Sequence, residues 1–375
     1  MQLGFEKNEK HRAETTLTES QSRQPSASVG RSLTAEAEFV PTGFRADRPS
    51  DSPPVAWQTA MKLAVRDSAE LLTRLGLGDR TDLSRRTTFP TFVPLEFLSR
   101  MKPGDPEDPL LKQVLAVARE DLEVDGFDAD PVGDLSATVR DSLLHKYDSR
   151  ALLITTSACG VHCRYCFRRE FPYQEAASRR SGWGQALAYL REHPEIDEVL
   201  LSGGDPLTLA DGQLAELLGA IDAIDHVRRI RFHSRMPVVI PQRINEAFLT
   251  TVGSLRATPW MVIHCNHAAE IDQAVIDAID RMVGRGIPVL NQAVLLRGVN
   301  DSVHVLEDLC RTLVDHRVQP YYLHQLDRVR GAAHFEVDPK VGVDLVRRLR
   351  DRLPGYAVPT YVQEHAGEKA KTVVP

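Results

Sequence analysis

The stretch Cys159-Gly-Val-His-Cys163-Arg-Tyr-Cys166-Phe-Arg168 places three cysteines within eight residues, at the spacing C-x3-C-x2-C. It follows the apolar run Ala151-Leu-Leu-Ile-Thr-Thr156, which is typical of a short buried strand. Three thiolates on one loop can hold three corners of an iron–sulfur cluster, and Gly160 lets the backbone of that loop fold back. No fourth cysteine lies nearby, so the sequence predicts an iron that stays open to an outside ligand.

A structural zinc site is the alternative for these cysteines, with His162 or a distant residue as the fourth ligand. Zinc sites usually pair C-x2-C with a second Cys or His pair, so we favour the cluster. The spacing C-x3-C-x2-C followed by an aromatic residue resembles the radical S-adenosylmethionine (SAM) enzymes. That resemblance implies a [4Fe-4S] cluster whose open iron binds SAM and cleaves it to a 5'-deoxyadenosyl radical.

Length and composition bound the class of protein. The chain has 375 residues, enough for one barrel-type domain with an extension or for two domains. Its formal net charge of -6 gives no indication of nucleic acid or a membrane surface as a partner. The N-terminus has no apolar core of a signal peptide, and no later run approaches a membrane span. We therefore expect a cytoplasmic protein with reduced cysteines.

The chain before residue 150 differs in character from the rest. Residues 1–52 are rich in Ser, Thr, Glu, Arg and Pro, so we expect a mostly disordered leader. A helical N-terminal region is expected over residues 53–149, because apolar residues recur there at three- and four-residue steps. The expected helices are Ala56–Arg66, Ala69–Leu77, Val93–Met101 and Pro109–Ala118.

From residue 150 short apolar strands alternate with amphipathic helices, which predicts parallel strands joined by right-handed crossovers. This pattern alone does not separate a doubly wound sheet from a barrel. The expected strands are Ala151–Thr156, Glu198–Ser202, Arg229–Ser234, Trp260–Asn266, Pro288–Val294, Gln319–Gln325 and Ala357–Val362. The expected helices between them are Trp183–Glu192, Gly212–Ile224, Ile271–Arg285, Ser302–Val314 and Val341–Arg352.

Chemically capable side chains recur at the carboxyl ends of these strands, where a β/α barrel gathers its active site. The cysteines follow the first strand and Ser202-Gly-Gly-Asp-Pro206 follows the second. The later strand ends carry His233-Ser-Arg235, His264-Cys-Asn-His267, Asn291-Gln292, Asp327 and Glu364–Lys371. The recurrence predicts that all of them meet at a single mouth.

Two of these motifs have a specific chemical interpretation. Gly203 and Gly204 let backbone approach a ligand, and Asp205 could accept from an ammonium group. Lys371 could form a Schiff base with pyridoxal phosphate (PLP), although a lysine so near the C-terminus is ordinarily solvated. By contrast, Cys265 and Cys310 are interpreted as core residues, and the run Arg228-Arg229-Ile-Arg231 as solvated charge.

Several segments together resemble the lysine 2,3-aminomutase family, most closely its bacterial branch that makes (R)-β-lysine for elongation factor P. The segments are Leu144–Leu153, Cys163–Tyr173, Leu201–Leu207, His233–Pro237, Leu290–Asp301, Tyr321–Asp327, Gly331–Phe335 and Gly367–Thr372. The likeness runs from about residue 54 to the C-terminus. It implies an α/β fold with a partial (β/α)6-type radical SAM barrel over residues 150–375, preceded by the helical extension.

The resemblance also implies a role for each matching position. Cys159, Cys163 and Cys166 would hold the [4Fe-4S] cluster, and Lys371 would carry PLP. The implied PLP contacts are Lys146, Tyr147 and Arg150. The implied SAM contacts are Tyr165, Ser202, Gly203, Gly204, Asp205, His264 and Gln292. The implied substrate contacts are Arg168 for the carboxylate and Asp327 with Glu364 for the side-chain ammonium.

The implied reaction converts L-α-lysine to (R)-β-lysine, and an acidic pair at the ammonium site would select a cationic substrate over glutamate. The implied partners are an electron donor such as flavodoxin or ferredoxin, elongation factor P and its lysyl ligase. Neither nucleic acid nor a membrane is expected as a partner.

The chain departs from the free-lysine enzymes of this family at several positions. Lys146 replaces an arginine, which keeps the charge but loses the bidentate fork. The loop before Lys371 reads Ala-Gly-Glu-Lys-Ala, so Lys369 is a competing PLP lysine. The sequence stops at Pro375 without a C-terminal extension. Three alternatives stay open: an aminomutase for another pathway or cationic amino acid, a radical SAM enzyme without PLP, and a non-catalytic metal-binding protein.

Overall fold

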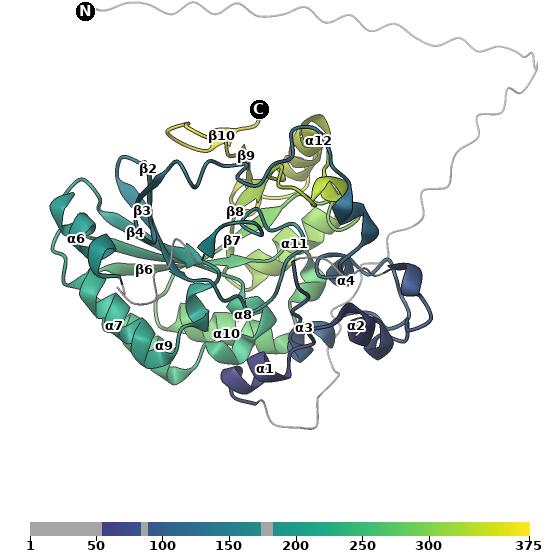
Figure 1. Ribbon diagram of the computed structural model, residues 1–375, viewed down its shortest axis with the longest axis horizontal. Helices are drawn as coiled ribbons and strands as arrows, with labels where there is room; N and C mark the ends of the chain where they lie inside the picture. Colours follow the sequence, from purple (N-terminus) through teal and green to yellow (C-terminus); the bar gives the residue numbers. More distant parts are fainter. Residues whose placement is uncertain (1–54, 84–88, 174–182) are drawn as a thin grey trace, which may run out of the picture. The chain divides into compact units, whose positions relative to one another are not determined.

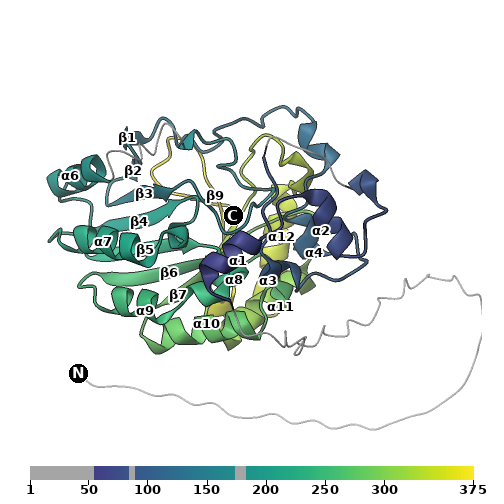
Figure 2. The ribbon, with the colours of Figure 1, turned by 60° about the horizontal axis from the view of Figure 1, so that its bottom comes forward.

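The computed structural model describes residues 55–83, 89–173 and 183–375, so the expected leader lies outside the described residues. Its centre is a ten-stranded sheet in which the strands follow one another in chain order (Figures 1 and 2). The strands are β1 (Thr138–Arg140), β2 (Leu143–Tyr147), β3 (Arg150–Thr156), β4 (Glu198–Gly203), β5 (Arg229–Ser234), β6 (Thr258–His264), β7 (Val289–Val294), β8 (Gln319–His324), β9 (Thr360–Gln363) and β10 (Thr372–Val373).

Strands β3 to β9 pair in parallel, as the alternation of strands and helices predicts. The two edges are antiparallel: β1, β2 and β3 form a meander, and β10 pairs with β9. The carboxyl ends of the parallel strands all lie on the same side of the sheet, at the strand ends and not at either lateral edge. We call this end of the partial barrel the mouth, and the site residues of every strand lie there.

Strand β5 separates an apolar face from a polar one. Ile230 and Phe232 are fully buried, and Phe232 packs against Phe248 of α9 with ring centroids 5.9 Å apart. Because side chains alternate along a strand, Arg231 and His233 face the opposite side. His233 lines the pocket at the mouth. The helices therefore cover the apolar face, and the polar face forms the inside of the partial barrel.

The larger helices lie along the outside of the sheet (Figure 2), and each buries one side. In α10, for example, Val275, Ile279 and Met282 are buried, and the Asp272 carboxylate caps the first turn by accepting from Val275 N. The crossover helices are α6 (Gly184–Glu192), α7 (Asp211–Asp222), α8 (Met236–Val239), α9 (Glu246–Gly253), α10 (Gln273–Gly284), α11 (Val303–Asp315) and α12 (Pro339–Arg350).

The region before the sheet contains α1 (Trp57–Leu63), α2 (Ser68–Arg74), α3 (Leu95–Leu98) and α4 (Pro109–Lys112). Helices α1 and α3 pack on each other, and α3 also packs on α8 (Figure 1). All four helices are shorter than the sequence predicts; α3 begins after Pro94 and α4 at Pro109, and each runs for only four residues. Strands β1 and β2 were not predicted. No helix of the described residues is long and apolar enough to cross a membrane.

Side chains and a loop join the two edges of the sheet. Lys146 of β2 contacts Glu364, which follows β9, with 3.0 Å between Nζ and Oε1. Asp128, ahead of β1, forms a parallel bridge with Val329, which follows β8. The sheet is thus a partial barrel whose open side is closed at the mouth, in agreement with the predicted fold class.

Candidate active site

Cys159, Cys163 and Cys166 lie on the loop that follows β3, at the mouth, and all three thiols are free and half-buried. Burial raises the pKa of Cys159, and it raises that of Cys166 to about 11, helped by the neighbouring Cys163. Three thiolates this close together in a buried pocket repel one another unless positive charge joins them. The donor set therefore suits an iron–sulfur cluster, whose iron offsets the thiolate charge.

The residues between the cysteines anchor this loop to the N-terminal region. Arg164 is fully buried and forms an ion pair with Glu120, which Arg169 also contacts at 2.6 Å. The backbone N–H of Arg164 donates to Gln113 O at 2.8 Å, and that of His162 donates to Phe92 O at 3.0 Å. The loop is therefore anchored to the N-terminal region by buried partners on either side of Cys163.

The zinc alternative finds no support in this geometry. The His162 ring lies against Phe89 with centroids 5.1 Å apart, and its Nδ1 is 2.9 Å from the Pro90 carbonyl oxygen. That contact involves Nδ1 alone and leaves Nε2 as the ring nitrogen for a ligand. Within the described residues, no group of three or more Cys, His, Asp or Glu side chains is placed to hold a single metal ion.

The glycine pair after β4 packs directly on the cysteine loop. Gly203 adopts a φ of +117°, and a Cβ on Gly204 would lie 2.2 Å from the carbonyl oxygen of Ala158. Gly204 N donates to Thr156 O at 2.8 Å, and Asp205 N to Ala158 O at 2.7 Å. Glycine is needed here because any side chain would push the two loops apart.

The Asp205 carboxylate is already surrounded by donors. Its Oδ1 accepts from Ser234 Oγ and Leu207 N, and its Oδ2 accepts from the backbone N–H groups of Arg235 and Met236, all between 2.7 and 3.2 Å. Burial nevertheless raises its pKa to about 6. Asp205 thus joins β4 to the turn after β5, and the neighbouring Gly203 O accepts from the Tyr173 hydroxyl at 2.7 Å.

One pocket at the mouth gathers most of the predicted residues. Its lining includes the three cysteines together with Tyr165, Arg168, Ser202, Gly203, Gly204, Asp205, His264, Gln292 and Asp327. Burial raises the pKa of Asp327 to about 7, and its carboxylate has no ion-pair partner in the part of the chain that the structure describes. Residues from β3, β4, β6, β7 and the loop after β8 therefore meet, as the strand-end pattern predicts.

Three histidines of the polar face have lowered pKa values and lack a hydrogen-bond partner for one ring nitrogen. Burial lowers the pKa of His264 and of His324 to about 3, and it lowers that of His233 as well. Their Nε2 atoms are buried and have no hydrogen-bond partner among the described residues. Buried ring nitrogens without partners indicate groups that a bound ligand completes.

Five charged residues form a continuous ion-pair chain from the C-terminal segment to the cysteine loop. Lys371 pairs with Glu364, which contacts Lys146 at 3.0 Å. Lys146 also contacts Asp134 at 2.6 Å, and the other oxygen of Asp134 accepts from Arg168 Nε at 2.6 Å. Arg168 in turn donates to Ser202 Oγ at 3.0 Å. We call these five residues the ion-pair chain.

Mutual attraction keeps the ion-pair chain charged despite burial. Burial acts against ionisation of Glu364, but Lys371 and Lys146 lower its pKa to about 2. Burial opposes the charge on Lys146 too, and the carboxylates of Asp134 and Glu364 outweigh it and raise its pKa. Asp134 has a lowered pKa because Arg168 and Lys146 outweigh its burial.

The remaining predicted PLP contacts lie beside this chain. The Arg150 guanidinium stacks over the Tyr147 ring at 4.1 Å, and Tyr147 lies next to Glu364. A register irregularity between Leu144 and Tyr147 lets neighbouring residues of β2 reach the same side of the sheet. Lys369 is exposed, whereas Lys371 is half-buried and paired. The structure therefore separates the two candidate lysines.

Several residues of the site were not predicted. Asp134, which is 1% exposed, lies in an irregular segment before β1 where no motif marks it. Glu120 and Glu270 are also buried, and each pairs with an arginine far away in the sequence. The Arg235 side chain belongs to a strand-end motif that the sequence does single out, and only the structure shows its partners.

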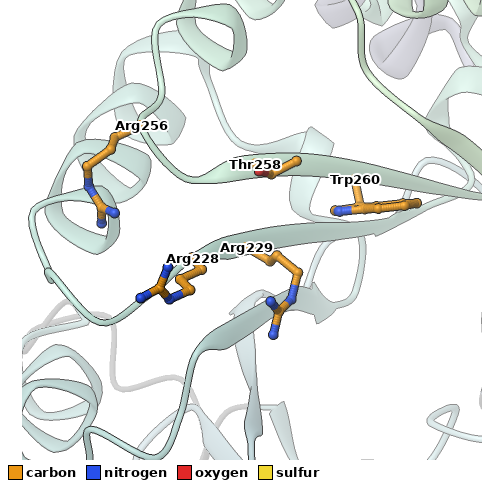
Figure 3. Close-up of a pocket in the computed structure, with 5 residues that line it drawn as sticks. All are labelled: Arg228, Arg229, Arg256, Thr258 and Trp260. Carbon is orange, nitrogen blue, oxygen red and sulfur yellow. The ribbon is translucent and has the colours of Figure 1, made fainter.

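A second hollow lies at the opposite ends of β5 and β6 (Figure 3). Of its three arginines, Arg229 pairs with Asp197, and Arg256 donates to carbonyl oxygens at the end of α7. Arg228 is exposed, in line with the interpretation of solvated charge. That interpretation is wrong for Arg231, which is 12% exposed and lies inside the barrel, 3.0 Å from Glu198.

The core interpretation is confirmed for Cys265 and Cys310, which are 0% and 2% exposed.

Comparison with known proteins adds to this geometry. The Radical SAM superfamily matches residues 153–309. The L-lysine 2,3-aminomutase of Escherichia coli (strain K12) is 43% identical over 320 residues, which cover 84% of this chain and 93% of that protein. The L-lysine 2,3-aminomutase of Haemophilus influenzae is 40% identical, covering 84% and 95%. Among solved structures, Streptococcus suis SuiB bound to S-adenosylmethionine is 11% identical, with a TM-score of 0.45 over 60% of this chain and 52% of that one.

Proposed function

The chain belongs to the lysine 2,3-aminomutase family of radical SAM enzymes, and from this premise we propose that it converts L-α-lysine to (R)-β-lysine with PLP as a second cofactor. Membership makes it an isomerase of the aminomutase type and implies a [4Fe-4S] cluster and SAM. The observation that carries the proposal is the ion-pair chain, which joins Lys371 to the cysteine loop across one mouth.

In the proposed site Cys159, Cys163 and Cys166 hold the cluster. Tyr165, Ser202, Gly203, Gly204, Asp205, His264 and Gln292 surround SAM. The support is that all ten residues line one pocket. The unpartnered His264 ring can hydrogen-bond to a ligand, while Asp205 holds the loop in place.

Lys371 is the proposed attachment point for PLP, with Lys146, Tyr147 and Arg150 as partners for its phosphate. Bound PLP would supply a π-system over which an unpaired electron can spread. The residues fit such a group because three cations gather there and the nearby His324 has an unpartnered ring nitrogen. The Glu364 carboxylate lies against Lys371 and can stabilise the protonated amine of Lys371 until the cofactor enters.

The substrate is proposed to exchange partners with the ion-pair chain. Arg168 would bind the α-carboxylate, an anion that can replace Asp134 on the guanidinium. Asp327 and Glu364 would bind the side-chain ammonium, which replaces the lysines now held by Glu364. Each member of the ion-pair chain then keeps a partner, and Asp327, which has no ion-pair partner among the described residues, gains one.

We further propose that the product serves the modification of elongation factor P through its lysyl ligase, with a flavodoxin- or ferredoxin-type electron donor. Lys146 and the loop that carries Glu364 and Lys371 resemble the branch of the family with that role. The cytoplasm is the corresponding location.

An anaerobic assay tests the proposal with reconstituted enzyme, dithionite, SAM, PLP and L-lysine, analysed by chiral chromatography. Formation of (R)-β-lysine, with no reaction of glutamate under the same conditions, is the expected result. Cleavage of SAM with unchanged lysine would support the radical SAM chemistry and contradict the assignment of lysine as the substrate. Turnover of another cationic amino acid in preference to lysine would redirect the assignment within the family.

A further inference from the structure

Arg235 follows β5 directly, and its guanidinium lies against the cysteine loop. The side chain is 5% exposed, and Nη1 is 2.7 Å from Sγ of Cys163. Nη2 donates to Gln113 Oε1 at 2.7 Å and to Glu270 Oε2 at 2.9 Å. Because Cys163 is a proposed cluster ligand, a permanent cation sits in contact with the cluster's coordination shell.

We propose that Arg235 is a positioning residue that raises the reduction potential of the iron–sulfur cluster, an inference that rests on the proposed cluster ligands. Reduction adds one negative charge to the cluster. A nearby cation and an N–H···S hydrogen bond favour the reduced form over the oxidised one. In a buried site with little water this electrostatic effect is stronger than it would be in solution.

The surroundings of Arg235 hold its guanidinium in this place. Glu270 is fully buried, and its Oε1 accepts from the backbone N–H groups of Asn266 and His267 and from Gln113 Nε2. The guanidinium also lies 5.2 Å from the centre of the Phe97 ring and 5.7 Å from that of Tyr165. A carboxylate fixed on one side and rings around it leave the cation no alternative position.

A second, independent observation concerns the third nitrogen of the same guanidinium. Arg235 Nε is buried and has no hydrogen-bond partner among the described residues, although the side chain lines the pocket at the mouth. An unpartnered charged donor in this pocket would be completed by an acceptor of a bound cluster.

Arg235 and Glu270 have opposite charges, so their variants are expected to shift the potential in opposite directions. Arg235→Gln removes the cation and should lower the potential, making the cluster harder to reduce. Glu270→Gln removes the anion that partly cancels Arg235, while its amide oxygen can still accept from Asn266 and His267, so it should raise the potential. The double variant should lie between them. A purely structural role predicts no such opposition of sign.

The test is a redox titration of the reconstituted proteins with dithionite, followed by EPR of the reduced cluster. Iron and sulfide are measured first in every protein. We expect Arg235→Gln to lower the ratio of reduced to oxidised cluster at least about tenfold at a fixed potential, which is about 59 mV for one electron. Arg228→Gln, at the other end of β5 and exposed, is the matched control and should leave the potential unchanged.

The outcomes separate this inference from the proposed function. Wild-type protein without iron and sulfide would reject the cluster ligands themselves. Full cluster content with an unchanged potential in Arg235→Gln would overturn the role of Arg235 and leave the ligands in place. If Arg235→Gln does not load the cluster, Glu270→Gln decides, and a potential that fails to rise overturns the inference.

Discussion

The two halves of the mouth are held together in different ways. Around the cysteines, backbone groups and buried ion pairs fix the loop: Asp205 accepts four hydrogen bonds, and Gly204 leaves no room for a side chain. Around Lys371, side chains pair with one another across the two edges of the sheet, and the two-residue strand β10 follows. The cluster half is held by backbone groups and buried ion pairs, whereas the PLP half is held by side-chain contacts that ligands can replace.

This difference fits the chemistry of the proposed groups. A cluster is bound by thiolates that cannot move far without losing it, so a rigid loop suits it. PLP and lysine bring a phosphate, a carboxylate and an ammonium, each of which needs an opposite charge. The ion-pair chain provides those charges and keeps them paired while the site is empty, which avoids the cost of isolated buried ions.

Removing the amine of Lys371 should have the largest effect and should disable the PLP half alone. Lys371→Ala should lower β-lysine formation by on the order of 10³-fold or more, since the proposed attachment of PLP is lost. Borohydride reduction should no longer trap a pyridoxyl label, while iron content stays unchanged because the cluster half is independent. Lys369→Ala is the matched control and should keep both label and activity. A label that disappears in the Lys369 variant instead would exchange the roles of the two lysines.

Asp134 is where the two halves touch, so its neutralisation should affect both. Asp134→Asn removes the carboxylate that Arg168 and Lys146 share. We therefore expect kcat/KM for lysine to fall on the order of 100-fold. Steady-state kinetics at saturating SAM and PLP measure this. Asp141→Asn, on an exposed residue nearby, should behave like the wild type. Equal kinetics for the Asp134 and Asp141 variants would show that the ion-pair chain is not functional.

A Glu120 variant tests whether buried ion pairs hold the cysteine loop in place. Glu120→Gln leaves two buried guanidinium groups without their carboxylate, and the free energy of unfolding should fall by about 3–5 kcal/mol. Denaturant titration of the apoprotein measures that loss, and the iron content after reconstitution should fall with it. Glu123→Gln, on an exposed glutamate nearby, is the control. An apoprotein of unchanged stability would contradict the anchoring role of Glu120.

The smallest expected effect is a dependence of lysine binding on pH. Burial raises the pKa of Asp327 to about 7, so below that pH the carboxyl group is protonated and loses its attraction for an ammonium. Glu364, with a pKa lowered to about 2, stays ionised. We expect the KM for lysine to rise up to about tenfold for each unit below about pH 7. In Asp327→Asn this dependence should vanish; if it persists unchanged, another group titrates.

Most of the fold was predictable because it depends on local patterns. The seven predicted strands overlap β3 to β9, and the five crossover helices agree within a few residues. The last strand begins later than predicted, at Thr360, since a 3-10 turn occupies Gly355–Ala357. Helices α8 and α9 were missed, as were the short strands β1, β2 and β10. Elements of two to eight residues carry too few side chains for periodicity to reveal them.

The site was predictable where it follows the strand ends and unpredictable where it depends on buried partners. The rule for parallel strands brings Ser202, His264 and Gln292 to one pocket. Asp134 and Arg168 are 34 residues apart, and Arg235 and Gln113 are 122 apart. No spacing in the sequence relates such pairs, because only the folded sheet brings their loops together.

The most direct test of the central claim, that both halves serve one reaction in one pocket, uses lysine deuterated at C3. We predict that deuterium from C3 appears in 5'-deoxyadenosine and in SAM recovered from the reaction, together with β-lysine. That result requires the substrate held by the ion-pair chain to lie within reach of SAM at the cluster. SAM cleavage that is independent of lysine, with no deuterium in the nucleoside, would show that the two halves do not act together.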